Sequence, residues 1–374
     1  MNLSRVEAMD SADASHHCSG TDPMQTLLVT GGAGFIGSCF VRRQIKRSVF
    51  RIINLDLLTY ASRGDSIPVT NRDSYVFVRG DIGDGKLVSR LLHQYKPIGI
   101  VNFAAESHVD RSIDRPSVFL KTNVVGTFQL LESSLAYFRS LDSSARSQFR
   151  FLQVSTDEVF GSLAEGVERF HEGTPYAPNS PYAASKASSD MFVRSYHKTY
   201  GLPTLTTNCS NNYGPYQFPE KFIPLMILNL LERRPLPLYG DGLNIRDWLY
   251  VDDHCEALDR VLQDGRIGDT YNIGGSCART NLNVAQLVCD LFDRISGRSG
   301  DSSRTLIDFV DDRPGHDRHY EVDFSKIKNE LDWQPRWDFE DGLQHTIQWY
   351  IANHDWVRKI QSGDYQRQRL GLRS

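Results

Sequence analysis

The chain has 374 residues, of which 40% are hydrophobic and 24% are charged, and its formal net charge is −4. This size and apolar content suffice for a sizeable hydrophobic core, whereas the slightly acidic balance, without a long lysine or arginine run, argues against a surface that binds nucleic acid. No apolar stretch reaches the roughly 18 residues that a membrane-spanning helix needs, so we expect neither nucleic acid nor a membrane as a partner.

The first 23 residues lack the hydrophobic core of a secretory signal, and we expect residues 1–23 to form a disordered tail. Met24 is therefore an alternative start of the protein. His16, His17 and Cys18 could suggest a metal site, but three adjacent ligands on a mobile tail do not make a preorganised coordination shell. The six cysteines are scattered, without a zinc or redox spacing. We expect reduced thiols, a cytoplasmic location and no bound metal.

Short apolar segments alternate with segments of helical periodicity over the first 210 residues. Strands are predicted, in chain order, at 26–30, 51–55, 75–79, 99–104, 149–155 and 204–208. Helices are predicted from about residue 35 and at 86–95, 118–137 and 181–200. This alternation predicts an α/β fold with a doubly wound parallel sheet and with ligands at the carboxyl ends of its strands.

The pattern loosens after about residue 211, where shorter elements are punctuated by prolines: Pro215, Pro219, Pro224, Pro235 and Pro237. We expect residues 24–210 to form the sheet domain. Residues 211–355 should form a smaller region that binds the substrate, with some segments returning to the sheet. A C-terminal tail is expected from residue 356 to residue 374.

The first predicted strand ends in a glycine-rich turn that opens a helix. Gly31 permits the tight turn, Gly34 lets backbone amides approach a pyrophosphate, and Gly37 allows close packing of helix on strand. Asp56 ends the next strand about 20 residues later, where a carboxylate binds adenosine ribose hydroxyls and repels the 2′-phosphate of NADP. These features predict a Rossmann-like NAD site in residues 24–210.

Two residues after the third predicted strand extend this prediction. Asp81 offers an acid for the adenine amine, and Ile82 offers an apolar wall for the adenine ring. Asp81 could equally be the N-cap of the following helix.

Five residues form a candidate catalytic group. Tyr182 and Lys186 are four residues apart and so share one helix face. An ammonium there lowers the pKa of the phenol and lets the tyrosine act as a base. On its own, such a pair is more often a surface contact. Thr156 ends a predicted strand and can polarise a reacting oxygen. Asp157 and Glu158 supply neighbouring carboxyl groups, which tend to adopt different protonation states. An exposed acidic turn is the alternative interpretation.

Together, the glycine turn, the Tyr182–Lys186 pair and Thr156 resemble the extended short-chain dehydrogenase/reductases that act on nucleotide sugars. The run Thr156-Asp157-Glu158 resembles their 4,6-dehydratase subfamily. Further long matches lie at 104–112, 208–216, 219–224, 245–252 and 312–318. The resemblance extends from about residue 27 to residue 350. The sequence departs from the family pattern at 62–65, and at Leu57 and Phe160, where relatives often carry lysine and tyrosine.

The resemblance implies that dTDP-glucose is converted to dTDP-4-keto-6-deoxyglucose and that NAD is regenerated in each turnover. Tyr182 would take the 4-hydroxyl proton as hydride passes to NAD⁺. Glu158 would then remove the proton at carbon 5, Asp157 would protonate the departing 6-hydroxyl, and the hydride would return to carbon 6. Elimination has to follow oxidation, because the 4-keto group acidifies the hydrogen on carbon 5.

The resemblance also implies two sets of binding residues. The cofactor would contact Gly31, Gly34, Phe35, Ile36, Gly37, Asp56, Leu58, Thr59, Asp81, Ile82, Ala104, Ala105, Ser107, Thr122, Tyr182, Lys186 and Asn211. The substrate would contact Ser107, His108, Thr156, Asn211, Lys221, Phe222, Pro237, Tyr239, Arg246, Asn281, Arg313 and His316. Arg246 is the strongest candidate, because a guanidinium can bind two phosphate oxygens. Its alternative role is an ion pair with Asp247 or Asp252.

Other functions stay open. UDP-glucose is an alternative substrate, because a hydrophobic pocket separates thymidine from uridine by only about 1–3 kcal/mol. A nucleotide-sugar 4-epimerase uses the same Tyr182–Lys186 pair but usually lacks the two carboxyl groups. A non-catalytic NAD-binding sensor should have lost some of these four groups. The resemblance also implies a homodimer that pairs through helices 118–137 and 181–200.

Overall fold

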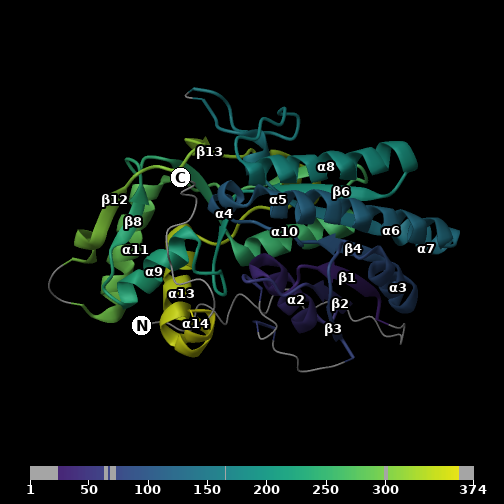
Figure 1. The fold of residues 1–374 in the computed structure, drawn as a ribbon, viewed down its shortest axis with the longest axis horizontal. Helices are drawn as coiled ribbons and strands as arrows, with labels where there is room; N and C mark the ends of the chain where they lie inside the picture. Colours follow the sequence, from purple (N-terminus) through teal and green to yellow (C-terminus); the bar gives the residue numbers. More distant parts are fainter. Residues whose placement is uncertain (1–23, 63–65, 68–72, 165, 299–301, 362–374) are drawn as a thin grey trace.

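A computed structural model describes residues 24–62, 66–67, 73–164, 166–298 and 302–361 (Figure 1). The expected N-terminal tail, with His16, His17 and Cys18, lies outside the described residues, as do residues 63–65 and 362–374. A seven-stranded parallel sheet with the order β10-β6-β5-β4-β1-β2-β3 organises the larger part of the chain. The predicted α/β class and doubly wound sheet are therefore confirmed.

The strands agree closely with the apolar runs of the sequence. They are β1 (Thr26–Thr30), β2 (Arg51–Asp56), β3 (Tyr75–Arg79), β4 (Gly99–Asn102), β5 (Arg150–Thr156), β6 (Thr204–Cys209) and β10 (Thr270–Ile273). The strand predicted at 99–104 ends two residues early, so that Phe103 and Ala104 belong to the loop beside the cavity described below. Strand β10 returns to the sheet from the C-terminal half of the chain.

Helices cover both faces of the sheet. One face packs against α2 (Phe35–Arg47), α10 (Val251–Asp264) and α12 (Ser325–Leu331). The other packs against α3 (Gly85–Tyr95), α6 (Thr127–Ser140) and α8 (Pro181–Tyr200).

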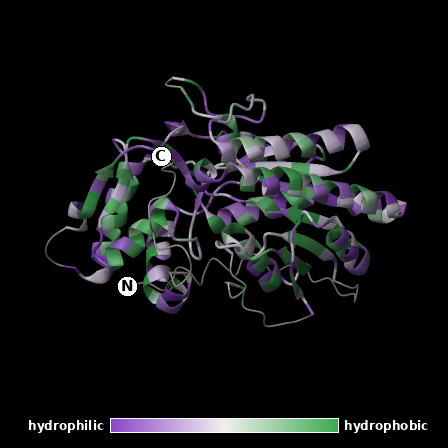
Figure 2. Cartoon of the chain, in the orientation of Figure 1, coloured by the Kyte–Doolittle hydropathy of each residue, from purple (hydrophilic) through white to green (hydrophobic). Residues whose placement is uncertain are grey.

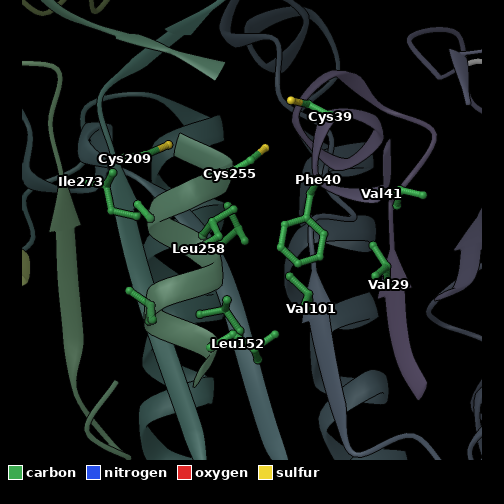
Figure 3. Packing of buried hydrophobic residues seen from close by; sticks show 14 of the residues in the cluster. Val29, Cys39, Phe40, Val41, Val101, Leu152, Cys209, Cys255, Leu258 and Ile273 are labelled. Carbon is green, nitrogen blue, oxygen red and sulfur yellow. The ribbon is translucent and has the colours of Figure 1, made fainter. Parts of the chain in front are cut away.

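Successive strand residues point to opposite faces, so both faces need apolar side chains. Val29 and Val101 lie near Phe40 of α2 and Leu258 of α10 (Figure 3). The preceding residue Leu28 packs with the helices of the opposite face. Each such fully buried side chain contributes about 1.5–3 kcal/mol relative to an exposed one.

The helix predicted at 118–137 is three consecutive segments: α5 (Pro116–Phe119), the π-helical η2 (Leu120–Gly126) and α6. Apolar periodicity does not reveal this π-helical turn, because the buried residues of η2 are Asn123 and Gly126, whereas its apolar Leu120 and Val125 are exposed. Such turns often occur at functional sites. Here η2 carries Thr122 to the cavity, and Asn123 donates to the Glu106 carbonyl and to Ser185 Oγ.

Most elements after residue 210 form a smaller region beside the sheet (Figure 1). Its strands are β7 (Asn211–Tyr213), β8 (Leu236–Tyr239), β9 (Ile245–Tyr250), β11 (Ala278–Thr280), β12 (Ile307–Val310) and β13 (His319–Tyr320). Its core lies among α9 (Phe222–Leu231), α11 (Asn281–Ser296) and α13 (Phe339–Ala352). Figure 2 shows α9 in green, in keeping with its almost uninterrupted apolar sequence.

The expected start of the C-terminal tail, residue 356, falls inside α14 (His354–Gln361). The Trp356 ring packs on Trp349 and Tyr216, with centroid distances of 5.0 and 5.6 Å. The described part of this segment is therefore a packed helix.

Candidate active site

A cavity lies at the carboxyl edge of the sheet, beside the ends of β1, β2, β4 and β5. Among the described residues, every one predicted to bind the cofactor lines this cavity except Leu58. The backbone N–H of Leu58 instead donates to Asp56 Oδ1 at 2.8 Å. The glycine turn, the loop after β4, η2 and α8 thus meet at one cavity.

The turn between β1 and α2 leaves no room for side chains. Gly31 has a φ of +68°, and a Cβ there would lie 2.6 Å from the backbone nitrogen of Ala104. A Cβ at Gly37 would lie 2.3 Å from the Gly31 carbonyl oxygen. Gly34 is the N-cap of α2, and within the described part of the chain no side chain caps this helix. Its first N–H groups therefore suit an anionic ligand such as a pyrophosphate.

Replacing Gly31 by alanine should weaken NAD binding at least tenfold, because the new Cβ meets backbone and the positive φ costs about 1–3 kcal/mol. Calorimetric titration with NAD and a thermal melt would measure this. Gly297→Ala is the matched control, since Gly297 has a φ of +63° and nothing within 4 Å of the added Cβ among the described residues. Equal NAD affinities of the two variants would contradict the assigned role of the turn.

Two carboxylates border the predicted adenosine end of the cavity. Asp56 is 5% exposed, and its Oδ2 accepts a hydrogen bond from the Ala33 N–H at 2.9 Å. A carboxylate oxygen has a second lone pair, so Asp56 can brace the glycine turn and still accept from a ribose hydroxyl. Asp81 lines the cavity, whereas the N-cap of α3 is Asp84. The N-cap alternative for Asp81 is therefore wrong.

The neighbouring carboxyl groups follow β5 in a short 3-10 turn, η3 (Asp157–Phe160). Thr156 caps this turn: its oxygen accepts from the Glu158 N–H, and its hydroxyl donates to Asp157 Oδ1, both at 3.3 Å. Asp157 is 1% exposed, and its Oδ2 has no hydrogen-bond partner among the described residues. The alternative interpretation of Asp157 and Glu158 as an exposed acidic turn is therefore wrong.

The surroundings of the two carboxyl groups differ. Burial raises the pKa of Asp157 well above its ordinary value, and the charge of Glu158 raises it further. Burial also raises the pKa of Glu158, but the positive charges of Arg313, Lys221 and Arg246 oppose that rise. This arrangement favours a protonated Asp157 beside an ionised Glu158, which makes one group an acid and the other a base.

Tyr182 and Lys186 lie in the first turns of α8, where Ser180 caps the helix through the Ala183 N–H. Both residues are buried. The alternative interpretation of the pair as a surface contact is therefore wrong. Lys186 Nζ donates to the Val154 carbonyl oxygen at 2.8 Å, which fixes the ammonium at the end of β5.

The pKa of Tyr182 differs from the expectation. Burial raises it well above its ordinary value and the charge of Glu158 adds to the rise, whereas a hydrogen bond with Thr156 lowers it. Removal of the phenol from water thus dominates the pKa of Tyr182, and burial is an effect that the four-residue spacing could not reveal.

Asp190 is a further buried group that the sequence analysis missed. It is 2% exposed and accepts a hydrogen bond from Ser155 Oγ at 2.5 Å. Burial raises the pKa of Asp190 to about 6, and the charge of Lys186 opposes the rise. Its spacing of four residues from Lys186 on α8 was the available signal.

Part of the predicted substrate set gathers near Glu158. Arg313 donates to Asp110 Oδ1 at 2.7 Å, and the Tyr239 hydroxyl donates to Asp110 Oδ2 at 3.0 Å. The ring of His316 lies 6.0 Å from that of Tyr239. Burial lowers the pKa of His316 to about 4, and the charge of Arg313 contributes. Asp110, on α4 (Val109–Asp114), was not predicted as a site residue.

Arg246 belongs to the same neighbourhood. It is 5% exposed, its guanidinium lies 4.2 Å from the centroid of the Tyr320 ring, and it donates to the Asp317 carbonyl oxygen at 2.8 Å. Asp247 accepts from Ser210 and from backbone amides instead. Within the described chain Arg246 forms no ion pair with Asp247 or Asp252, so that alternative is wrong.

The remaining predicted substrate residues divide into two groups. Cavity-lining residues are Ser107, Thr156, Asn211 and Lys221. His108 is buried, with its ring nitrogen 3.2 Å from the Glu220 carbonyl oxygen. Neither His108 nor the four residues placed above, Tyr239, Arg246, Arg313 and His316, line the cavity as the described residues form it. The same holds for three others: Phe222 lies against Trp248, Pro237 pairs with Asp308, and the Asn281 N–H donates to the Asn244 carbonyl.

Two further observations concern the described residues as a whole. They contain no group of three or more histidine, cysteine and acidic side chains arranged to hold a metal ion. They also include no helix with the length and apolar character needed to span a membrane.

Comparison with known proteins agrees with this geometry. A family model described as GDP-mannose 4,6 dehydratase matches residues 28–346. The dTDP-glucose 4,6-dehydratase of Xanthomonas campestris pv. campestris (strain B100) is 54% identical over 350 residues, which are 93% of this chain and 99% of that protein.

Solved structures give the same result. The dTDP-glucose 4,6-dehydratase of Bacillus anthracis, in complex with NAD, is 47% identical with a TM-score of 0.79, over 90% of this chain and 99% of that one. The Streptomyces venezuelae enzyme of the same name, solved with NAD bound, is 45% identical with a TM-score of 0.81, over 90% and 100% of the two chains. The chain belongs to the dTDP-glucose 4,6-dehydratase family.

Proposed function

We propose that the protein dehydrates dTDP-glucose to dTDP-4-keto-6-deoxyglucose, with NAD regenerated in every turnover. The observation that supports this most directly is the pair of the buried Asp157 and the partly buried Glu158 beside Tyr182. Loss of water needs an acid and a base in addition to the group that takes the hydroxyl proton. A 4-epimerase needs no such pair, and a non-catalytic NAD-binding sensor needs neither the pair nor Tyr182.

NAD, which the glycine turn and Asp56 would hold, would supply the hydride acceptor for carbon 4 and the hydride donor for carbon 6. Tyr182, in its phenolate form, takes the proton of the 4-hydroxyl, and Thr156 polarises the same sugar oxygen when its hydroxyl turns from Asp157 Oδ1 to the sugar. Lys186, fixed by the Val154 carbonyl, orients this end of the site. Glu158 removes the proton at carbon 5 once the 4-keto group has acidified it. Asp157 gives its proton to the departing 6-hydroxyl.

We assign cofactor binding to residues 24–210. The glycine turn, which has no side chains to block a ligand, and the N-terminus of α2 suit the pyrophosphate. Asp56 suits the adenosine ribose and, because its carboxylate repels a 2′-phosphate, favours NAD over NADP. Asp81 and Ile82 border the place where the adenine would lie.

We assign nucleotide-sugar binding mainly to residues 211–355. Lys221, Arg246 and Arg313 each affect the pKa of Glu158 and so lie close to the acid-base pair. Three cations suit a diphosphate, and two of them are guanidinium groups that can each hold two oxygens. Their charges also favour the ionised form of Glu158.

The decisive experiment incubates the purified protein with dTDP-glucose and UDP-glucose in separate tubes, without added cofactor. Product mass and the alkali-induced absorbance of a 4-keto sugar are followed. We expect loss of one water from dTDP-glucose, and the two rates give the preference for the base. An unchanged mass with galactose configuration would indicate an epimerase, and no turnover even with added NAD would overturn the proposal.

We also propose a homodimer through η2 and α8. These elements expose large apolar side chains: Leu120 is 58%, Val125 48% and Met191 49% exposed. Exposed apolar side chains gathered on neighbouring elements are typical of an interface. Met191→Glu should convert a dimer to a monomer in light scattering at micromolar concentration. Phe309→Glu, at a 55% exposed position on β12, is the matched control, and a wild-type monomer would contradict the proposal.

A further inference from the structure

Glu220 connects two loops that border the cavity. Its side chain is only 1% exposed, and both carboxylate oxygens are engaged. Oε1 accepts from the Tyr60 hydroxyl at 2.9 Å, and Oε2 accepts from Arg111 Nε at 2.8 Å. Tyr60 belongs to the loop after β2, and Arg111 belongs to α4. A buried carboxylate therefore joins three segments that are far apart in the sequence.

Tyr60 is held from three sides. Its hydroxyl donates to Glu220, the Arg111 guanidinium lies 3.8 Å from its ring centroid, and Phe218 meets its edge at 5.5 Å. The residues beside Tyr60 in the sequence, Thr59 and Ala61, line the cavity where the cofactor is proposed to bind. Fixing Tyr60 therefore fixes the cofactor loop, which we define as residues 57–62.

The residue after Glu220 reaches the substrate side of the cavity. Lys221 lines the cavity, and its Nζ donates to the Ser107 carbonyl oxygen at 2.6 Å. Gln217, Phe218 and Glu220 line the cavity too, so residues 217–221 form its substrate segment. The backbone carbonyl of Glu220 meets the ring nitrogen of His108, which anchors the segment a second time.

The groups around Glu220 are charged as well as hydrogen-bonded. Glu106 is a second carboxyl group near Arg111, and burial followed by the charge of Glu220 raises the pKa of Glu106. Burial lowers the pKa of Arg111, but the charge of Glu220 and its hydrogen bond contribute to a net rise of that pKa. A neutral amide at position 220 would leave Arg111 facing Glu106 and remove the charged acceptor of the Tyr60 hydroxyl.

We propose that Glu220 is a positioning residue that couples the cofactor loop to the substrate segment, so that NAD stays bound while the sugar passes through its steps. This inference rests on the proposed dehydration of dTDP-glucose. Glu220 acts through Tyr60 and Lys221 and transfers no proton. Loss of the Glu220 carboxylate therefore changes the rate of NAD release and the affinity for the sugar, with little effect on the chemical step.

Two variants test the proposal, Glu220→Gln and Tyr60→Phe. Each should release NAD about tenfold faster in a dialysis assay without substrate, because a hydrogen bond to a charged group typically contributes at least one order of magnitude to an equilibrium constant. With saturating NAD, the KM for dTDP-glucose should rise while kcat stays within about twofold of the wild type. Glu340→Gln, in an exposed pair with Arg294 at 3.9 Å, is the matched control.

The double variant adds a second criterion. If Glu220 acts through Tyr60, the double variant should release NAD no faster than Glu220→Gln alone, since contacting residues are not additive. Wild-type NAD retention in both single variants, or additive effects in the double variant, would overturn the coupling. The dialysis assay contains no sugar, so its result is independent of the substrate. Failure of the wild type to dehydrate dTDP-glucose would instead disprove the proposed function.

Discussion

Tyr182→Phe is expected to lower kcat about 10³-fold, within the range that general acid-base catalysis typically contributes. The variant keeps the ring that packs against Phe119 at 6.2 Å, and loses only the oxygen that takes the 4-hydroxyl proton. Without that base the 4-keto sugar cannot form, and no later step can begin. Formation of the 4-keto product, followed by mass, measures the loss.

The matched control is Tyr200→Phe on the same helix. Tyr200 is 47% exposed, and its ring contacts Tyr196 at 5.1 Å, so the substitution removes a hydroxyl far from the cavity. It should leave kcat within about twofold of the wild type. Binding of NAD to Tyr182→Phe should also stay near the wild-type level. A Tyr182→Phe variant that retained a tenth or more of the activity would show that another group takes the proton.

The sheet could be predicted from the sequence because its determinants are local. Each central strand is a short buried apolar run, and β1 leads directly into the glycine turn. Gly31, Gly34 and Gly37 lie close together in the chain, so their spacing already expresses the geometry of the turn. The same reasoning missed the π-helical η2, since the residues that it buries, Asn123 and Gly126, carry no apolar side chain.

Much of the site was not predictable in this way because its contacts join distant residues. Tyr60 and Glu220 are 160 positions apart, and Asp110 and Arg313 are 203 positions apart. The pKa of Tyr182 depends on burial by the whole fold, which explains why a local pair suggested the wrong direction. The resemblance supplied most of the binding residues, yet eight of the twelve predicted substrate residues, including Asn281, do not line the cavity formed by the described residues.

Asp157→Asn and Glu158→Gln are expected to separate oxidation from elimination. Both variants keep Tyr182, so both should still form the 4-keto sugar, detected by trapping with borohydride. Both should lose dehydration by about 10²–10⁴-fold, because each removes one partner of the acid-base pair. Glu168→Gln, at an exposed position, is the matched control and should behave as the wild type.

Stability should distinguish loss of chemistry from loss of folding. Burial raises the pKa of Asp157 in the folded protein above its unfolded value, so the folded state binds this proton more tightly. The contribution of Asp157 to the free energy of unfolding is therefore present at low pH, and it is lost as the pH rises through the pKa of this group in the folded protein. Asparagine has no proton to lose, so Asp157→Asn should melt no lower than the wild type at neutral pH.

Turnover in deuterated water assigns the two roles. If Glu158 removes the carbon 5 proton, Asp157→Asn should still exchange that hydrogen, and the recovered sugar should carry deuterium at carbon 5. Glu158→Gln should form the 4-keto sugar without deuterium, because the base itself is missing. The cationic neighbours of Glu158 and the burial of Asp157 favour this division of roles over its reverse. Exchange in Glu158→Gln but not in Asp157→Asn would require the two roles to be swapped.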